Sequence, residues 1–376
     1  MRLALITNIP SPYRLPVWQA LAGKVESIQV FFCSETEPNR IWKSEGEGEF
    51  RFSQVHLPGA HFFIQNMDWG LHFNPGLWKE LDRFAPDHIL ISGYETPSYL
   101  LALLYAKIKK IPITLWWASH ALSSRVRGGP IAWLKRWILN RFDSYCAVSH
   151  AASEYLLTDM GVPAHKIARA INTVDVQRWH VEAQKHRAAP SGGPVRFLCI
   201  GQFIPRKGIL ELLHAFQALH DDAVLRLVGY GPQEAQIREF IAAHHLHNVE
   251  IAGATQTIEQ TAPHYAWADV LVMPSLIEVW GLVVNEALVC GAYVLSSKYA
   301  GVTYDLIEGA PYDVGQSFDP ANKQDFVAAL RSAIDKRATV DRRALAAWGL
   351  RHTPEAYADG LWNALNLVEG HAAGSA

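Results

Sequence analysis

Short apolar segments that alternate with helical segments, in two successive series, limit what this chain can fold into. In the first half, the pattern predicts buried strands separated by helices, and regular alternation of this kind favours a parallel, doubly wound α/β sheet. The strands are expected at 2–7, 28–33, near 50–57, 88–92, 112–117 and 144–148, and the helices at 74–84, 97–109 and 130–141.

The second series begins after a polar stretch rich in Ala, Pro and Gly, VEAQKHRAAPSGGP at 181–194. Its strands are expected at 195–200, 224–229, 249–252, 269–273 and 293–297, and its helices at 208–219, 233–243, 257–267, 281–290 and 322–334. We therefore predict a Rossmann-like domain over 1–180, a linker over 181–194, a second Rossmann-like domain over 195–352 and a final helix within 353–370.

Composition narrows the class of protein. A chain of 376 residues with a formal charge of −2 has room for two ordinary domains and no overall basic field for nucleic acid. The four cysteines form no C-x-x-C pair, and buried thiols in a reducing compartment are expected. No apolar run reaches the ~18 residues of a membrane span, and the N-terminal LALI is too short for a signal-peptide core. These features predict a cytoplasmic protein.

The segment DVLVMPSLIEVWGLVVNEALVCG (269–291) carries the main candidate site. It predicts a buried strand, a Pro-Ser stop, a loop containing Glu278 and a helix that starts near Gly281 and contains Glu286. Two isolated glutamates would be interpreted as a loop acid and a solvated helix acid. The largely apolar helix around Glu286 argues against that interpretation, because an acid there needs a partner.

The start of this helix suits a negatively charged group. Amides in a first helical turn have no intrahelical acceptor, so those of Gly281, Leu282 and Val283 would point, with the helix dipole, at an anion between the two acids. A phosphate on the amides, with hydroxyl-rich groups near the carboxylates, describes a sugar nucleotide.

Two further turns follow strands of the second series. GQFIPRKG (201–208) puts Arg206 and Lys207 at the carboxyl edge of the sheet, where they would neutralise a departing diphosphate. Solvated basic residues are the alternative, but cations are disfavoured at a helix start. Gly229 and Gly231 lie in LVGYGP (227–232), and glycines allow a ligand to approach the backbone closely.

Together these motifs resemble retaining glycosyltransferases of family 4, which have the GT-B fold. PSLIEVWGLVVNEALVCG is similar to that family's P-S-x-x-E-G-F-G-L-x-x-x-E-A-x-A-x-G, with Val279 and Trp280 replacing Gly-Phe. The turn at 227–232 is similar to V-G-x-G-P, and the turn at 201–208 to G-R-x-x-x-x-K-G, except that Gln202 replaces the phosphate-binding arginine.

The resemblance implies roles for these residues. Glu278 would contact the hydroxyls of the donor sugar, Glu286 the ribose and Lys207 the phosphate. Arg206 would compensate for the arginine missing at Gln202. The GT-B fold implies two Rossmann-like domains facing a central cleft, and a C-terminal helix that crosses back to the first domain.

Candidates in the first half are weaker. His120 follows the strand at 112–117; it is either a satisfied structural histidine or, as the resemblance implies, a ligand of donor sugar or phosphate oxygens. The loop from Ser11 to Arg14 would shape the acceptor side, with Arg14 reaching phosphate. Tyr94 and Glu95 are acceptor-side candidates by position alone.

The segment RVRGGPIAWLKRWILNRF (125–142) mixes basic and aromatic residues. As a helix it would have one apolar-aromatic face and one basic face. That pattern fits a helix lying on anionic lipid at the inner membrane surface. It equally fits a helix that docks its apolar face on the sheet and leaves its basic face in water, which is the more ordinary arrangement.

These expectations define a metal-independent, retaining glycosyltransferase that needs no cofactor. The donor would be a UDP- or GDP-linked sugar and the acceptor a glycan or lipid-linked hydroxyl, in bacterial surface polysaccharide or glycoconjugate synthesis. No D-x-D motif is present, and His244, His245 and His247 have no ligating partner nearby in the sequence. The alternatives are a GT-B sugar phosphorylase, a nucleotide-sugar epimerase or a non-catalytic sugar-nucleotide-binding subunit.

Overall fold

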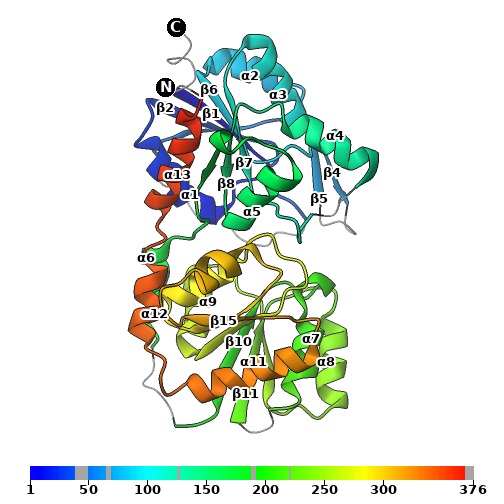
Figure 1. The fold of residues 1–376 in the computed structure, drawn as a ribbon, viewed down its shortest axis with the longest axis vertical. Coiled ribbons are helices and arrows are strands. Elements are labelled where there is room, and N and C mark those ends of the chain that lie inside the picture. The colour runs from blue at the N-terminus through cyan, green and yellow to red at the C-terminus, as the bar shows by residue number, and fades with distance from the viewer. Residues whose placement is uncertain (39–49, 65–68, 125–127, 188–191, 220–221, 369–376) are drawn as a thin grey trace. The chain divides into compact units, whose positions relative to one another are not determined.

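The computed structural model of the chain describes residues 1–38, 50–64, 69–124, 128–187, 192–219 and 222–368 (Figure 1). These residues form two compact units. Unit 1 runs from Met1 to Asn172 and takes in the C-terminal segment from Pro354, and unit 2 runs from Thr173 to Thr353.

Unit 1 is built on a seven-stranded sheet in which each strand is parallel to its neighbours, in the order β3-β2-β1-β6-β7-β8-β9. Central strands such as β1 and β6 are almost wholly buried, as expected when helices cover both faces of a parallel sheet. The strands are β1 (Arg2–Thr7), β2 (Ser27–Phe32), β3 (Ser53–His56), β6 (His88–Ile91), β7 (Ile113–Trp117), β8 (Ser144–Ala147) and β9 (Ile167–Arg169).

Alternate residues of these strands support two apolar layers. One layer joins the sheet to α1 (Leu15–Ala22) and α13 (Pro354–Asn366). The Trp116 indole of β7 also donates a 2.7 Å hydrogen bond to the hydroxyl of Tyr357 on α13. The other layer joins the sheet to helices that lie together on the opposite face in Figure 1. These are α2 (Leu77–Phe84), α3 (Pro97–Lys109), α4 (Gly129–Leu139) and α5 (His150–Glu154), which continues into η3 (Tyr155–Asp159).

Unit 2 repeats the plan with six parallel strands in the order β12-β11-β10-β13-β14-β15. The strands are β10 (Val195–Ile200), β11 (Ala223–Val228), β12 (Val249–Gly253), β13 (Val270–Met273), β14 (Tyr293–Ser297) and β15 (Gly315–Phe318). The helices are α6 (Val176–Lys185), α7 (Ile209–Phe216), α8 (Glu234–Ala243), α9 (Ile258–Trp267), α10 (Leu282–Val289), α11 (Lys323–Lys336) and α12 (Arg342–Gly349). Side chains of Thr257, Asn322 and Asp341 cap α9, α11 and α12.

The predicted fold class is confirmed, because both units are parallel α/β sheets covered by helices. The differences are local. The antiparallel hairpin β4 (Ala60–Ile64) and β5 (Trp69–Phe73) was not expected, nor were the edge strands β9 and β15 or the helices α5 and α12. Residues 181–185 of the predicted linker are helical in α6, which belongs to unit 2, and 188–191 lie outside the described residues. None of the described helices combines the length and apolarity needed to cross a bilayer.

The docking of α13 on unit 1 supplies a stability test. Leu361 of α13 is fully buried in the layer shared with α1, whereas Asn363 on the same helix is exposed. We expect Leu361→Ala to lower the unfolding free energy of unit 1 by roughly 2–5 kcal/mol, since it removes buried methyl groups and leaves a cavity. Urea unfolding followed by circular dichroism measures the loss. Asn363→Ala is the control and should change stability by less than about 0.5 kcal/mol; equal effects of the two variants would contradict this packing.

Candidate active site

The loops that follow β10 and β13 in unit 2 are held against each other by their backbones. The backbone N–H groups of Leu276 and Ile277 donate to the carbonyl oxygen of Arg206, at 2.8 and 3.3 Å. Gly208 lies beside them with φ +67°, and a Cβ there would fall 2.0 Å from the carbonyl oxygen of Pro274. A glycine is required at this position both by its left-handed backbone and by the approach of the second loop.

This contact places Lys207 against Glu278. The Lys207 ammonium forms an ion pair with Glu278 Oε2, and the Ser275 hydroxyl donates to the same oxygen at 3.3 Å. Burial alone would raise the pKa of Glu278, but the charges of Lys207 and Arg206 and these hydrogen bonds outweigh burial and lower it. Glu278 is therefore an ionised, largely buried carboxylate beside two cations.

Glu286 has a different environment in the first turns of α10. Its Oε2 accepts a 2.6 Å hydrogen bond from the Tyr265 hydroxyl. Burial raises the pKa of Glu286 to about 7, and the Tyr265 hydrogen bond offsets this only in part. The sequence prediction that this acid needs a partner is met by Tyr265 of α9, which the sequence did not single out.

The start of α10 is shaped by Gly281, which has φ +110° and lies against the Met273 side chain at the end of β13. The Trp280 indole donates to Asn285 Oδ1 at 2.9 Å and fixes the loop to the helix. The helix begins at Leu282, so the first-turn amides of Leu282 and Val283 have no intrahelical acceptor. A negatively charged group at this end of α10 would meet those amides and the positive end of the helix dipole.

The glycine turn after β11 packs on the turn after β10. A Cβ on Gly229 would lie 1.8 Å from the Gly201 carbonyl oxygen, and one on Gly231 would lie 2.5 Å from that of Phe203. The Gln202 amide donates to the Tyr230 hydroxyl at 3.4 Å. These glycines therefore have a packing role here, and the close ligand approach predicted for them stays a prediction.

The weaker candidates belong to unit 1. His120 is buried just after β7, where its backbone N–H donates to Ser123 Oγ at 2.9 Å. The Arg14 guanidinium lies over the Trp116 ring, 4.5 Å from its centre. Tyr94 packs on Trp117, and burial raises its pKa above the ordinary value. The structure thus brings Lys207 and Arg206 together with Glu278 in unit 2 and pairs Glu286 with Tyr265, while the candidates of unit 1 belong to the other sheet.

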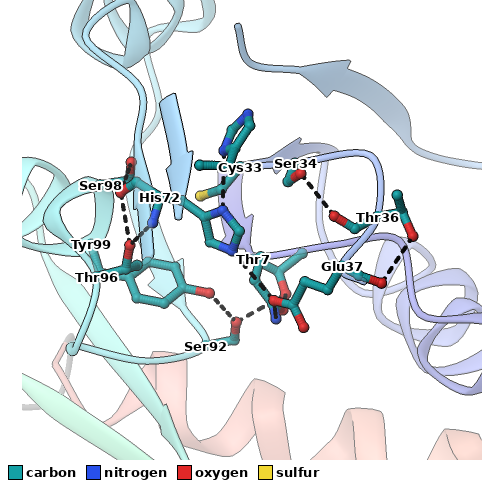
Figure 2. Close-up of polar contacts among 12 residues, drawn as sticks. Thr7, Cys33, Ser34, Thr36, Glu37, His72, Ser92, Thr96, Ser98 and Tyr99 are labelled. Atoms are coloured by element: carbon teal, nitrogen blue, oxygen red, sulfur yellow. Dashed lines mark hydrogen bonds and ion pairs between the residues drawn. The ribbon is translucent and has the colours of Figure 1, made fainter. Parts of the chain in front are cut away.

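Unit 1 also holds a polar cluster that sequence reasoning missed (Figure 2). Glu37 Oε1 accepts from Asn8 Nδ2 at 2.9 Å and lies 3.3 Å from His72 Nε2, and both Glu37 and His72 are buried. Beside them, Ser92 Oγ bonds Thr7 Oγ1 at 2.9 Å and lies 3.0 Å from the Tyr99 hydroxyl.

These side chains gather at the carboxyl ends of β1, β2 and β6, the edge where open α/β sheets bind ligands. A buried carboxylate among hydroxyls suits a polyhydroxylated ligand. Asn8 could have been recognised as a site candidate from the sequence, because it directly follows the first strand. His72 could not, because the hairpin that carries it was not predicted from the sequence.

Metal binding has no support in the described ranges, where no three His, Cys, Asp or Glu side chains come together as a candidate metal site. The chemistry available in unit 2 is that of two cations, an ionised carboxylate, a carboxyl that titrates near neutrality and a helix N-terminus.

Several solved structures share this fold. The lipopolysaccharide outer core galactosyltransferase WaaB aligns with a TM-score of 0.72 at 17% identity, covering 97% of this chain and 99% of that one. Sucrose-phosphate synthase from Thermosynechococcus elongatus aligns at 0.71 and 18% identity over the full length of both chains. HepE from Anabaena aligns at 0.68 and 16% identity, covering 100% and 99%. The fold is that of the GT-B glycosyltransferases.

Sequence comparison identifies the family. The model of the glycosyl transferases group 1 matches residues 181–347, and that of Glycosyltransferase Family 4 matches residues 28–178. The glycogen synthase of Mycobacterium tuberculosis is 28% identical over 235 residues, 61% of this chain and 54% of that protein. The sulfoquinovosyl transferase SQD2 of Arabidopsis thaliana is 26% identical over 292 residues, 74% and 55%. The chain spans about half the length of these relatives, and it belongs to the group 1, family 4 glycosyltransferases.

The raised pKa of Glu286 predicts a pH-dependent stability. The folded protein holds this proton up to about pH 7, whereas the unfolded chain releases it near the ordinary value of 4.5. Because the folded state binds more protons between these values, this group makes the unfolding free energy fall as pH rises from 4.5 to 7, by roughly 3 kcal/mol in all. Glu286→Gln stays uncharged, so its melting temperature should rise relative to that of the wild type over this window.

Two further variants sharpen the test. Tyr265→Phe removes the hydroxyl that stabilises the carboxylate, so the wild-type slope should extend to higher pH. Glu259→Gln is the control, because its bond to Arg178 holds the pKa of Glu259 at about 2, outside the window. Parallel melting curves of wild type and Glu286→Gln from pH 4.5 to 7 would show that Glu286 does not titrate there.

Proposed function

We propose that this protein transfers a sugar, with retention of anomeric configuration, from a nucleoside diphosphate sugar to a hydroxyl of a glycan or lipid-linked acceptor. UDP- and GDP-linked sugars are the donors of this proposal, and bacterial surface polysaccharide or glycoconjugate synthesis is its setting. Neither a metal nor a cofactor takes part in it. The observation that carries the proposal is the Lys207–Glu278 ion pair, with Arg206 beside it and the N-terminus of α10 at the end of the same loop.

The ion pair gives each half of the donor a partner. When a diphosphate binds, Lys207 and Arg206 exchange the Glu278 carboxylate for phosphate oxygens, and charge-assisted bonds of this kind are stronger than neutral ones. Glu278 is then available to accept hydrogen bonds from sugar hydroxyls. Glu286, with Tyr265 behind it, accepts from the ribose hydroxyls of the same ligand. Arg206 supplies the positive charge that Gln202 lacks, because it already acts on the Glu278 carboxylate.

The proposed step exchanges one bond at the anomeric carbon for another. The bond from that carbon to the diphosphate oxygen breaks, with its electron pair going to the diphosphate. The acceptor oxygen bonds to the same face of the carbon, and its proton passes to the leaving phosphate oxygen. Lys207, Arg206 and the amides of Gly281, Leu282 and Val283 stabilise the charge that develops on the diphosphate.

Several relatives give this proposal its direction. HepE structures are described in complex with UDP and with UDP-glucose, which supports a UDP-linked donor. The names of WaaB and of the putative colanic acid biosynthesis glycosyltransferase WcaL of Salmonella typhimurium support a glycan acceptor at the cell surface. His120 and the acceptor-side residues Tyr94 and Glu95 keep their proposed roles in unit 1. The membrane contact proposed for 125–142 belongs to the same setting.

A panel of nucleotides tests the donor site. We expect UDP or GDP, and the matching sugar nucleotide, to raise the melting temperature of the wild type. Lys207→Met should weaken nucleoside diphosphate binding by about tenfold to a hundredfold, since a charge-assisted bond is lost. Glu278→Gln should bind the nucleoside diphosphate at least as tightly as the wild type, because Lys207 is no longer paired, yet transfer should fall by about a hundredfold or more.

Lys298→Met is the matched control, because Lys298 pairs with Asp319 at 2.7 Å elsewhere in unit 2. Product analysis with donor alone, with inorganic phosphate and with acceptor glycans distinguishes a transferase from a phosphorylase or an epimerase. Binding without any turnover would favour the non-catalytic alternative. If no nucleotide shifts the melting temperature, or if Lys207→Met binds as well as Lys298→Met, the donor-site assignment is wrong.

A further inference from the structure

Helix α4 presents its aromatic residues to solvent. Ile131, Trp133, Leu134 and Trp137 expose 66, 67, 47 and 48% of their surface, and they form what we call the α4 outer face. The residues of α4 that are buried are Lys135 and Leu139. The ordinary arrangement predicted for this helix holds only in part. Ile138 and Leu139 pack on the layer beside the sheet and Arg136 is exposed, but Lys135 lies inside and the two tryptophans lie outside.

The buried lysine holds the helix in this orientation. Lys135 Nζ donates to Tyr155 Oη at 2.9 Å and to Ser124 Oγ at 3.1 Å, and it lies over the rings of Tyr155 and Trp117. These contacts join α4 to η3 and to β7. Burying an ammonium while leaving two indoles in water opposes the usual free-energy preference of both groups. The arrangement becomes favourable when something apolar covers the outer face.

A second apolar stripe lies on the same side of unit 1. Leu100, Leu104 and Ile108 are spaced four residues apart on α3 and are exposed. Helices α3 and α4 pack on the same layer of the sheet, and Lys107 near the end of α3 bonds Asp143, which follows α4, at 2.8 Å. Exposed apolar side chains are therefore present on both helices that cover this face of the sheet.

The charged side chains of α3 and α4 themselves are all basic, although Lys107 and Lys109 pair with Asp143 and Asp82 and Lys135 is buried. The sequences of α3 and α4 contain four Lys and Arg residues and no Asp or Glu. Arg136 and Arg141 line an open hollow with Trp133, Trp137 and Asn140, and the Arg141 guanidinium lies over the Trp137 ring. The Arg136 guanidinium donates to the backbone carbonyl oxygen of Asp159, and among the described residues neither arginine is paired with a carboxylate. Arg125 and Arg127 lie outside the residues that the structure describes.

We infer that the α4 outer face and the α3 stripe dock on the surface of an anionic lipid bilayer. Tryptophan and leucine enter the boundary between headgroups and acyl chains, and Arg136 and Arg141 meet lipid phosphates in the hollow between the indoles. Arg136 and Arg141, in the hollow beside the exposed indoles, are complementary to such a bilayer, whereas the chain as a whole carries a charge of −2. The inference rests on the proposed function only for the lipid-linked acceptor, because docking itself requires no donor.

Vesicle binding of the full chain tests this surface. We expect the wild type to sediment with phosphatidylcholine vesicles that contain phosphatidylglycerol, and to bind pure phosphatidylcholine about tenfold or more weakly. Trp133→Ser/Trp137→Ser should lower binding to both vesicle types, and it should remove the quenching of tryptophan fluorescence by brominated lipid. Arg136→Gln/Arg141→Gln should lower only the binding to anionic vesicles and remove its salt dependence.

Phe62→Ser is the control, since Phe62 is 68% exposed on the hairpin of the same unit and should leave binding unchanged. All variants alter exposed side chains, so their melting curves and their nucleotide-dependent shifts should match those of the wild type. That last measurement separates failure of docking from failure of the donor site. Equal binding of the wild type and the tryptophan variant would overturn the inference. So would a wild-type dimer in sedimentation velocity that only the tryptophan variant loses, since the occupant would then be a second copy of the chain.

Discussion

The candidate site depends on one close backbone contact, between the turn after β10 and the loop after β13. The order of strands in unit 2 makes β10 and β13 parallel neighbours, with Phe197 opposite Val270, although the two strands are far apart in the sequence. Their carboxyl ends, Ile200 and Met273, therefore lie at the same edge of the sheet. Gly208 allows the loops to touch, because any Cβ would collide with the Pro274 carbonyl. Lys207 and Glu278 are joined by that contact, and everything inferred about diphosphate binding follows from their pairing.

The two glutamates of the motif differ because their neighbours differ. Both are largely surrounded by protein, and burial pushes the pKa of each upward. Glu278 faces two cations, which reverse the effect, whereas Glu286 has only the Tyr265 hydroxyl. One carboxyl is thus ionised at neutral pH and the other titrates there. Environments that separate the pKa values of paired acids are typical of catalytic and binding sites, where each acid has its own task.

Much of the fold and part of the site could be predicted from the sequence. The central strands and their helices were readable because parallel strands buried on both faces leave continuous apolar runs, and the predicted helix at 97–109 coincides with α3. The segment 269–291 was correctly predicted as a strand, a loop with Glu278 and a helix with Glu286. The hairpin that carries His61 and His72 was missed. Its strand β4 is largely exposed, so it lacks the continuous buried run of the parallel strands, and the hairpin forms an antiparallel sheet of its own. Glu37 could not be recognised from the sequence either, because its partner His72 lies on that hairpin.

The sequence by itself determined the class of the protein, since the order of strands, helices and glycine turns is local information that each segment carries alone. Only the tertiary structure decided which polar side chains meet: Lys207 with Glu278, Tyr265 with Glu286, and Lys135 with Tyr155. The last pair decided which side of α4 faces water, against the hydrophobic pattern of the helix. Hydrogen bonds and ion pairs between distant segments leave no periodic trace in the chain, because their partners are set by the packing of elements and not by spacing along it.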